Sequence, residues 1–243
     1  TERVPFPTSA GSGTLSVGAA ALLSLAVERD AATLLAGTRG AGKTTLLGAL
    51  LWELPASTRA VVIEDTPELP VDQLQEAGRD VQALHTDEEG VGPTEALRTA
   101  LRLGEGALVL GEVRGEEAAA LYEAMRVGAS GSAVLGTIHG DGGSAVHERV
   151  VTDLGVPASS FAATDLVVTC EPYETPGGRA RRVRTVEEVV TSADGTRFEP
   201  LFELDADGAL TATGRVDRGN SHFVESLSQA SETYGDVRDA LDE

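Results

Sequence analysis

Residues 37–44 constrain the fold of this chain more than any other segment. They read Gly-Thr-Arg-Gly-Ala-Gly-Lys-Thr and contain Lys43, the only lysine among the 243 residues. The pattern G-x-x-x-x-G-K-[ST] is that of a phosphate-binding loop (P-loop), in which backbone N–H groups turn onto phosphate oxygens. An apolar strand is expected before the loop at Thr33–Ala36, and a helix after it at Thr44–Leu54. Because strand, loop and helix follow one another, the required context of the motif is present.

The residues of this loop have defined chemical tasks. The lysine of such a loop reaches the β- and γ-phosphates, and the hydroxyl after it would hold Mg²⁺. ATP and Mg²⁺ are therefore the expected ligands. We expect the contacts to the nucleotide to come from Gly37, Arg39, Gly40, Ala41, Gly42, Lys43, Thr44 and Thr45.

Apolar runs and helical patterns alternate along the first 170 residues. Strands are predicted at Ala60–Ile63, Ala107–Leu110, Ser132–Ile138 and Asp165–Thr169, and a further possible strand at Val81–Leu84 in an otherwise irregular stretch, 69–92. Helices are predicted at Thr14–Arg29, Thr94–Leu103, Glu116–Val127 and Ser144–Asp153, after a loop over residues 1–13. Buried strands alternating with helices predict an α/β fold with a mostly parallel, twisted sheet flanked by helices.

The pattern changes after residue 170. Short strands are predicted at Arg181–Thr191, Phe198–Leu204 and Leu210–Val216, with Asp-Gly turns at 194–195 and 207–208. The acidic tail, Ser221–Glu243, is predicted to be helical. We therefore divide the chain into a core, residues 1–170, and a small antiparallel and helical appendage of the same domain, residues 171–243.

Polar residues follow several of the predicted strands. Glu64, Asp65 and Glu68 come after the second strand, Glu112 after the third and His139 after the fourth. Ligands of open parallel sheets bind beyond the carboxyl ends of the strands, so these side chains should meet the loop at one edge. Taken alone, the acidic segment could equally be a solvated turn. A lone histidine is more often structural, but the neighbouring motifs favour a functional role for His139.

The order of these segments resembles that of a known family. The P-loop is followed by Ile-Glu-Asp-Thr-Pro-Glu at 63–68, Gly-Glu-Val-Arg-Gly-Glu-Glu-Ala at 111–118, and Thr-Ile-His-Gly at 137–140 with Arg149 beyond. This is similar to the type II/type IV secretion ATPase superfamily, whose members drive secretion and the assembly of pili and archaella. The resemblance covers roughly residues 5–170 and implies a RecA-like P-loop NTPase core.

The resemblance also implies roles for individual residues. Glu112 would be the catalytic glutamate that orients water, and Glu64 would assist it. His139 would sense the γ-phosphate. Thr44, Asp65 and Glu68 would serve the metal ion. Arg98, Arg102 and Arg149 could neutralise charge or reach between subunits, although Arg98 and Arg102 could equally be solvated surface arginines.

Gly111, within the Gly-Glu-Val-Arg-Gly segment that is most diagnostic of the family, stands where many P-loop proteins have a magnesium-binding aspartate. The sequence departs from the family pattern at two places. Arg39 stands where the family has a small hydroxyl residue. We also expect that the family's N-terminal domain, which closes over the nucleotide, is absent from this chain, because the sequence starts at Thr1 just before the core.

Charge and composition bear on environment and partners. The 39 acidic and 19 basic residues give a net charge of −20, which disfavours direct contact with nucleic acid. Acid excess with almost no lysine resembles proteins of halophilic archaea, whose salty cytoplasm screens self-repulsion. Cys170 is the only cysteine, so an intrachain disulfide is impossible. With no apolar run near 18 residues, the expected location is cytoplasmic, peripheral to the inner face of the membrane.

These observations together predict an ATP-hydrolysing motor subunit for secretion or for pilus or archaellum filaments. A homo-hexameric ring and a membrane-embedded assembly protein are the partners that the resemblance implies. Two alternatives stay open at this stage. One is a relative that translocates DNA or another substrate in conjugation or competence. The other is a nucleotide-binding structural subunit without turnover.

Overall fold

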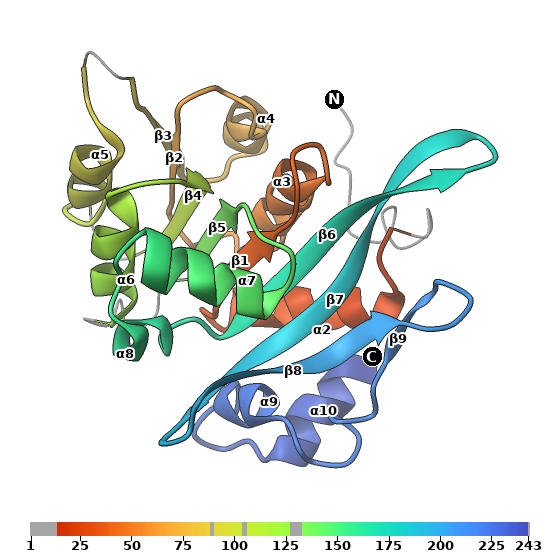
Figure 1. The fold of residues 1–243 in the computed structure, drawn as a ribbon. Coiled ribbons are helices and arrows are strands. Elements are labelled where there is room, and N and C mark those ends of the chain that lie inside the picture. Colours follow the sequence, from red (N-terminus) through yellow and green to blue (C-terminus); the bar gives the residue numbers. More distant parts are fainter. Residues whose placement is uncertain (1–13, 88–89, 104–105, 127–132, 243) are drawn as a thin grey trace.

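The structure is a computed structural model that describes residues 14–87, 90–103, 106–126 and 133–242 (Figure 1). The loop predicted over residues 1–13 and the predicted element ends at Val127 and Ser132 lie outside these ranges. None of the helices in the described ranges is long and apolar enough to cross a membrane.

Within these ranges the strands form one sheet of nine, in the order β3-β2-β4-β5-β1-β6-β7-β8-β9. All pairings from β3 to β6 are parallel, and those from β6 to β9 are antiparallel. The strands are β1 (Ala32–Ala36), β2 (Ala60–Glu64), β3 (Val81–His85), β4 (Ala107–Val113), β5 (Val134–Ile138), β6 (Leu166–Thr175), β7 (Gly178–Ser192), β8 (Gly195–Leu204) and β9 (Leu210–Ala212). The predicted fold class, a largely parallel sheet with a small antiparallel part, is confirmed.

Helices cover both faces of this sheet (Figure 1). They are α2 (Val17–Glu28), α3 (Lys43–Glu53), α4 (Val71–Glu76), α5 (Pro93–Ala100), α6 (Glu117–Arg126), α7 (Gly143–Glu148) with the π-helical turn η1 (Arg149–Asp153), α8 (Ala158–Phe161), α9 (His222–Ser226) and α10 (Tyr234–Asp242). The short helices α4 and α8 were not predicted, because each is too brief to show a helical period in the sequence.

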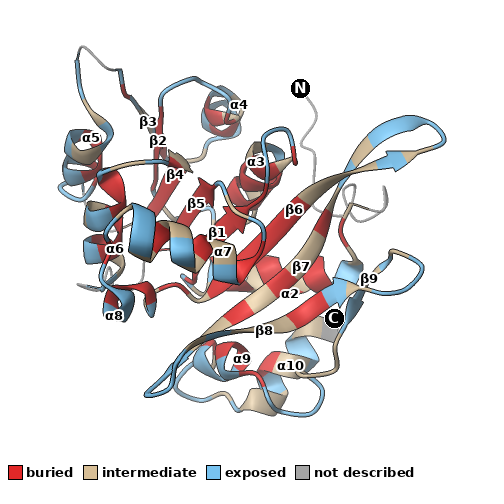
Figure 2. Ribbon diagram, in the orientation of Figure 1, coloured by how far each residue is buried: buried red, intermediate tan, exposed pale blue. Residues whose placement is uncertain are grey.

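Alternate residues of the central strands belong to two separate cores. Leu35 and Val62 pack in the cluster that includes buried residues of α2, α3 and α4. Leu34 and Val61 pack in the cluster that includes α5, α6 and α7. Every residue of β1 and β2 is therefore buried, as Figure 2 shows for the centre of the sheet. This two-sided burial explains why these strands read as continuous apolar runs.

Two predicted boundaries were wrong in ways that matter for the site. The strand predicted to stop at Leu110 continues to Val113, so Glu112 lies inside β4, where the register against β5 shifts. The helix predicted to reach Leu103 ends at Ala100, so Arg102 lies in the following turn. Arg98 and Arg102 are therefore not a pair on one helix face.

The antiparallel part is longer than the sequence indicated. β6 runs through residue 170 to Thr175, and β7 extends over 15 residues from Gly178 to Ser192. The two strands form a long hairpin that joins the parallel sheet through β1 (Figure 1). The sheet is continuous at the boundary that we placed after residue 170, and that boundary stays a prediction.

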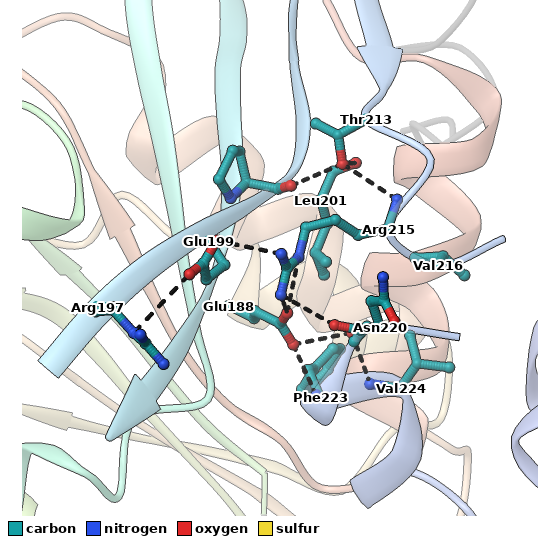
Figure 3. Close-up of polar contacts among 12 residues, drawn as sticks. Glu188, Arg197, Glu199, Leu201, Thr213, Arg215, Val216, Asn220, Phe223 and Val224 are labelled. Carbon is teal, nitrogen blue, oxygen red and sulfur yellow. Dashed lines mark hydrogen bonds and ion pairs between the residues drawn. The ribbon is translucent and has the colours of Figure 1, made fainter. Parts of the chain in front are cut away.

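A buried carboxylate fastens α9 to this extension (Figure 3). Glu188 of β7, only 1% exposed, accepts hydrogen bonds from the Ser221 hydroxyl at 2.9 Å and the Phe223 N–H at 2.8 Å. The Arg215 guanidinium lies 3.1 Å from its other oxygen. Ser221 also caps α9 by accepting from the Val224 N–H at 3.1 Å. These partners replace the water that burial removes from the Glu188 carboxylate, and their bonds hold α9 on the sheet.

Candidate functional site

The predicted site residues meet in one cavity of about 1280 Å³ beyond the carboxyl ends of β1, β2, β4 and β5. Its lining includes most of the predicted residues, namely Arg39, Gly40, Ala41, Gly42, Lys43, Thr44, Thr45, Glu64, Asp65, Glu68, Glu112, His139 and Arg149. Strands β4 and β5 lie on one side of β1 and β6 on the other. β1 is thus an inner strand, and the loop that follows it lies at the carboxyl end of the sheet, where open parallel sheets bind their ligands.

The loop between β1 and α3 has the backbone that a phosphate cradle needs. Gly40 and Gly42 have φ of 77° and 100°, which a residue with a side chain adopts only with strain. Gly37 is buried under the loop, with φ of 146°. A Cβ atom there would lie 2.4 Å from the carbonyl oxygen of Cys170 in β6. Glycine at position 37 therefore lets the loop pack directly onto the neighbouring strand.

Lys43 begins α3 and is almost wholly buried, with 9% of its surface exposed. Its Nζ donates to the carbonyl oxygens of Gly37 at 3.0 Å and Thr38 at 3.1 Å. A buried ammonium needs such partners, and here the loop itself supplies them. The cation is thereby held directly under the loop, at the position from which it can meet an incoming phosphate.

Cys170 lies in the same buried environment, beside Gly37. Burial raises the pKa of its thiol to about 12, although the positive charge of Lys43 acts in the opposite direction. The thiol is therefore neutral at physiological pH, and we assign it to the packing beneath the loop.

Glu64 ends β2 and is buried, with 5% of its surface exposed. Its Oε2 accepts from the backbone N–H groups of Glu68 at 3.0 Å and Leu69 at 3.2 Å. The carboxylate thus shapes the acidic segment. A Cβ atom at Gly111 would lie 3.1 Å from the Glu64 Cβ, a close approach that favours glycine at this position of β4.

An arginine joins the two acidic strand ends. Arg114 Nε donates to Glu112 Oε2 at 2.5 Å, and its Nη1 lies 3.1 Å from Asp65 Oδ2. The Glu112 carboxylate, beside the guanidinium, raises the pKa of Arg114. Buried Glu117 fixes the backbone of this turn by accepting from the N–H groups of Arg114 and Gly115 at 2.6 and 2.8 Å. In this state Glu112 is engaged in an ion pair.

The remaining predicted residues fall into two groups. His139 follows β5 at the cavity and is exposed, and Arg149 of η1 lines the cavity while pairing with Asp153 at 3.0 Å. Arg98 and Arg102 are exposed on and after α5 and do not line this cavity. If these two arginines contact a nucleotide, it must be one that is bound to another molecule.

Sequence reasoning missed two arginines of the site. Arg114 was visible within the Gly-Glu-Val-Arg-Gly motif, but the motif does not reveal that it bridges Glu112 and Asp65. Arg181 of β7 also lines the cavity, and its Nε donates to the Gly40 carbonyl at 2.8 Å. No local signal marks Arg181, because 141 residues separate it from Gly40.

The site can hold a polyphosphate and a metal ion together. The open cradle of Gly40 and Gly42 and the buried Lys43 fit phosphate. Within the described ranges, no three His, Cys, Asp or Glu residues gather as a metal site. Mg²⁺ does not require such a cluster, because it is commonly bound through one or two protein groups and the phosphates of the substrate. Thr44 and the carboxylates of the acidic segment are the residues available to share it.

Comparison with known sequences identifies relatives of this chain. It matches the family described as "Type II/IV secretion system protein" over residues 10–171, more than half of its length. An uncharacterised protein of Methanocaldococcus jannaschii is 31% identical over 180 residues, which are 73% of this chain and 66% of that protein. The type IV secretion system protein PtlH of Bordetella pertussis is 43% identical over 122 residues, 48% of this chain and 34% of PtlH.

Solved structures are similar as well. The VirB11 ATPase from the Brucella suis type IV secretion system, in complex with sulphate, gives a TM-score of 0.57 at 25% identity, covering 75% of this chain and 54% of that one. The pilus retraction motor PilT with bound ADP gives a TM-score of 0.53 at 19% identity over 89% of this chain and 58% of that one, and shows a shared fold.

The chain spans between 34% and 66% of the length of these four proteins. The order of the four motifs, their meeting at one sheet edge and the match over residues 10–171 agree. The chain belongs to the type II/IV secretion system protein family.

Proposed function

We propose that this chain is the ATP-hydrolysing part of a motor ATPase that powers secretion or the assembly of pilus-like or archaellum filaments. The observation that carries the proposal is the convergence of Lys43, Thr44, Glu112 and His139 on one cavity beside the P-loop. The sulphate complex named for the Brucella suis VirB11 ATPase supports it, because sulphate has the shape and charge sign of phosphate.

The geometry suggests how the site would work. Lys43 would neutralise the β- and γ-phosphates, and the loop N–H groups would hold them. Thr44, with Asp65 and Glu68 nearby, would share a Mg²⁺ ion that supplies further charge neutralisation. Glu64 would support this segment through its bonds to the Glu68 and Leu69 N–H groups.

Glu112 would orient the water that attacks the γ-phosphorus. The bond to the β–γ bridging oxygen would break, ADP would leave, and the proton of the water would pass to the released phosphate or solvent. Because Arg114 now holds the Glu112 carboxylate, that ion pair must loosen before the carboxylate can accept from water. His139, at the end of β5, would respond to the loss of the γ-phosphate.

Two substitutions and a matched control test the proposal. Lys43→Ala should abolish ATP and ADP binding. Glu112→Gln should still bind ATP, with turnover reduced by roughly 10²-fold or more, the usual effect of removing a catalytic acid–base group. Glu116→Gln makes the same charge change at an exposed residue outside the cavity and should behave like the parent. Binding and turnover are measured in low and molar KCl, because the net charge is −20.

Each outcome of this experiment has a clear meaning. If the parent binds neither nucleotide, or if Glu112→Gln turns over as fast as the parent, the proposed site is wrong. Binding by the parent without turnover at either salt concentration would favour a nucleotide-binding subunit that does not hydrolyse.

The wider assembly is part of the same proposal. We propose a homo-hexameric ring at the inner face of the cytoplasmic membrane, acting on a membrane-embedded assembly protein. A conjugative role is the second candidate, because a putative conjugal transfer protein of Mycobacterium tuberculosis is 35% identical over 144 residues. The net charge of −20 disfavours direct contact of this chain with DNA. DNA binding that weakened steeply with salt would reverse that preference.

A further inference from the structure

Four arginines line the cavity, and they differ in their partners. Arg114 is paired with Glu112 and Asp65, and Arg149 is paired with Asp153. Arg39 and Arg181 have no carboxylate partner among the described residues.

Arg39 and Arg181 both line the cavity, and positive charges that no carboxylate neutralises favour an anion beside them. Arg39 belongs to the phosphate loop itself, and its place was predicted from the sequence. Arg181 comes from a different part of the chain.

Arg181 is held against the loop by two contacts. Its Nε donates to the Gly40 carbonyl oxygen at 2.8 Å. Its Cδ would lie 3.2 Å from a Cβ atom built on Gly42, so the stem of the side chain covers a glycine that has no side chain of its own. Both contacts fall on the segment that turns around the predicted phosphate position.

The Arg181 guanidinium has N–H donors that make no hydrogen bond among the described residues. Only its Nε is engaged, and Nη1 and Nη2 have no hydrogen-bonding partner in the part of the chain that the structure describes. Fixing Nε leaves a planar group whose remaining N–H donors match the geometry of phosphate oxygens.

We propose that Arg181 is a phosphate ligand of this site, supplied from β7 to a nucleotide bound on the P-loop. The assignment rests on the proposed function and deepens it, because it makes the antiparallel hairpin part of the nucleotide site. The charge of Arg181 would join that of Lys43 on the phosphates, while its Nε keeps the Gly40–Gly42 turn in place.

The experiment compares Arg181→Gln, Arg181→Lys and the control Arg179→Gln. Arg179 lies two residues away in β7, is exposed and does not line the cavity. Arg179→Gln therefore removes the same charge as Arg181→Gln without touching the proposed site. Dissociation constants for ADP and for adenosine are measured by calorimetry at several KCl concentrations. Thermal unfolding confirms that each variant is folded.

A direct phosphate contact has a specific signature. Arg181→Gln should raise the dissociation constant for ADP about tenfold, as expected for loss of one charge-assisted hydrogen bond. The dissociation constant for adenosine should not change. The salt dependence of ADP binding should become shallower. Arg181→Lys keeps the charge but lacks the planar set of donors, so it should recover only part of the affinity and keep the salt dependence of the parent. Arg179→Gln should match the parent.

The alternative is that Arg181 only props the loop through Gly40. In that case the salt dependence of ADP binding by Arg181→Gln would be that of the parent, and this result overturns the assignment. ADP affinity of Arg181→Gln within twofold of the parent overturns it as well. A parent that binds no nucleotide overturns the proposed function itself, so the two failures are distinguishable.

Discussion

The Glu188 cluster allows a quantitative prediction about how the C-terminal helices are attached (Figure 3). In the Glu188→Ala variant, the Ser221 hydroxyl and the Phe223 N–H lose the acceptor that they now reach at 2.9 and 2.8 Å. Each buried polar group left without a partner costs about 1–3 kcal/mol. Arg215 loses less, because it keeps Glu199 at 3.2 Å and the Asn220 carbonyl at 2.9 Å. The expected total is about 2–5 kcal/mol.

Thermal unfolding followed by circular dichroism measures this loss. In a protein of this size about 3 kcal/mol lowers Tm by roughly 6–12 °C. Hydrogen exchange should show faster exchange in α9 before the parallel sheet is affected, since the lost bonds lie between α9 and β7.

Glu199→Ala is the matched control. Glu199 pairs with the same arginine but is 31% exposed, so its removal should cost less than about 1 kcal/mol. If Glu188→Ala melts within about 2 °C of the parent, or no lower than Glu199→Ala, our view that burial makes Glu188 decisive is refuted.

Two further predictions concern the phosphate loop and acid stability. Gly37→Ala should lose ADP binding and cost about 2–4 kcal/mol in urea unfolding, because its Cβ would meet the Cys170 carbonyl at 2.4 Å. Gly40→Ala, whose Cβ meets nothing within 4 Å, should cost less, and an equal loss would contradict the packing argument. The hydrogen bond from Arg29 lowers the pKa of Glu232 from 4.5 to about 2. That pair should stabilise the fold above pH 4.5 and lose its effect toward pH 2; Glu232→Gln should remove this pH dependence.

The central part of the fold could be predicted from the sequence because its signals are local. The buried strands β1, β2 and β4 are visible as short apolar runs, and Gly37–Thr44 specifies a strand, a glycine-rich turn and a helix in sequence order. Such signals depend on neighbouring residues, so no knowledge of the tertiary fold is required. Element ends depend on tertiary contacts: Glu112 lies within β4 because β5 provides a partner beyond Leu110.

What the sequence by itself determined is the set of chemical groups: one lysine in a phosphate loop, and the acidic and histidine motifs that follow later strands. What only the tertiary structure decided is which distant groups meet them. Arg114 reaches Asp65 across 49 residues, and Arg181 reaches Gly40 across 141. These contacts follow from strand order. β4 lies beside β2, and only β6 separates β7 from β1. Strand order is set by the burial of whole faces, and no short stretch of sequence records it.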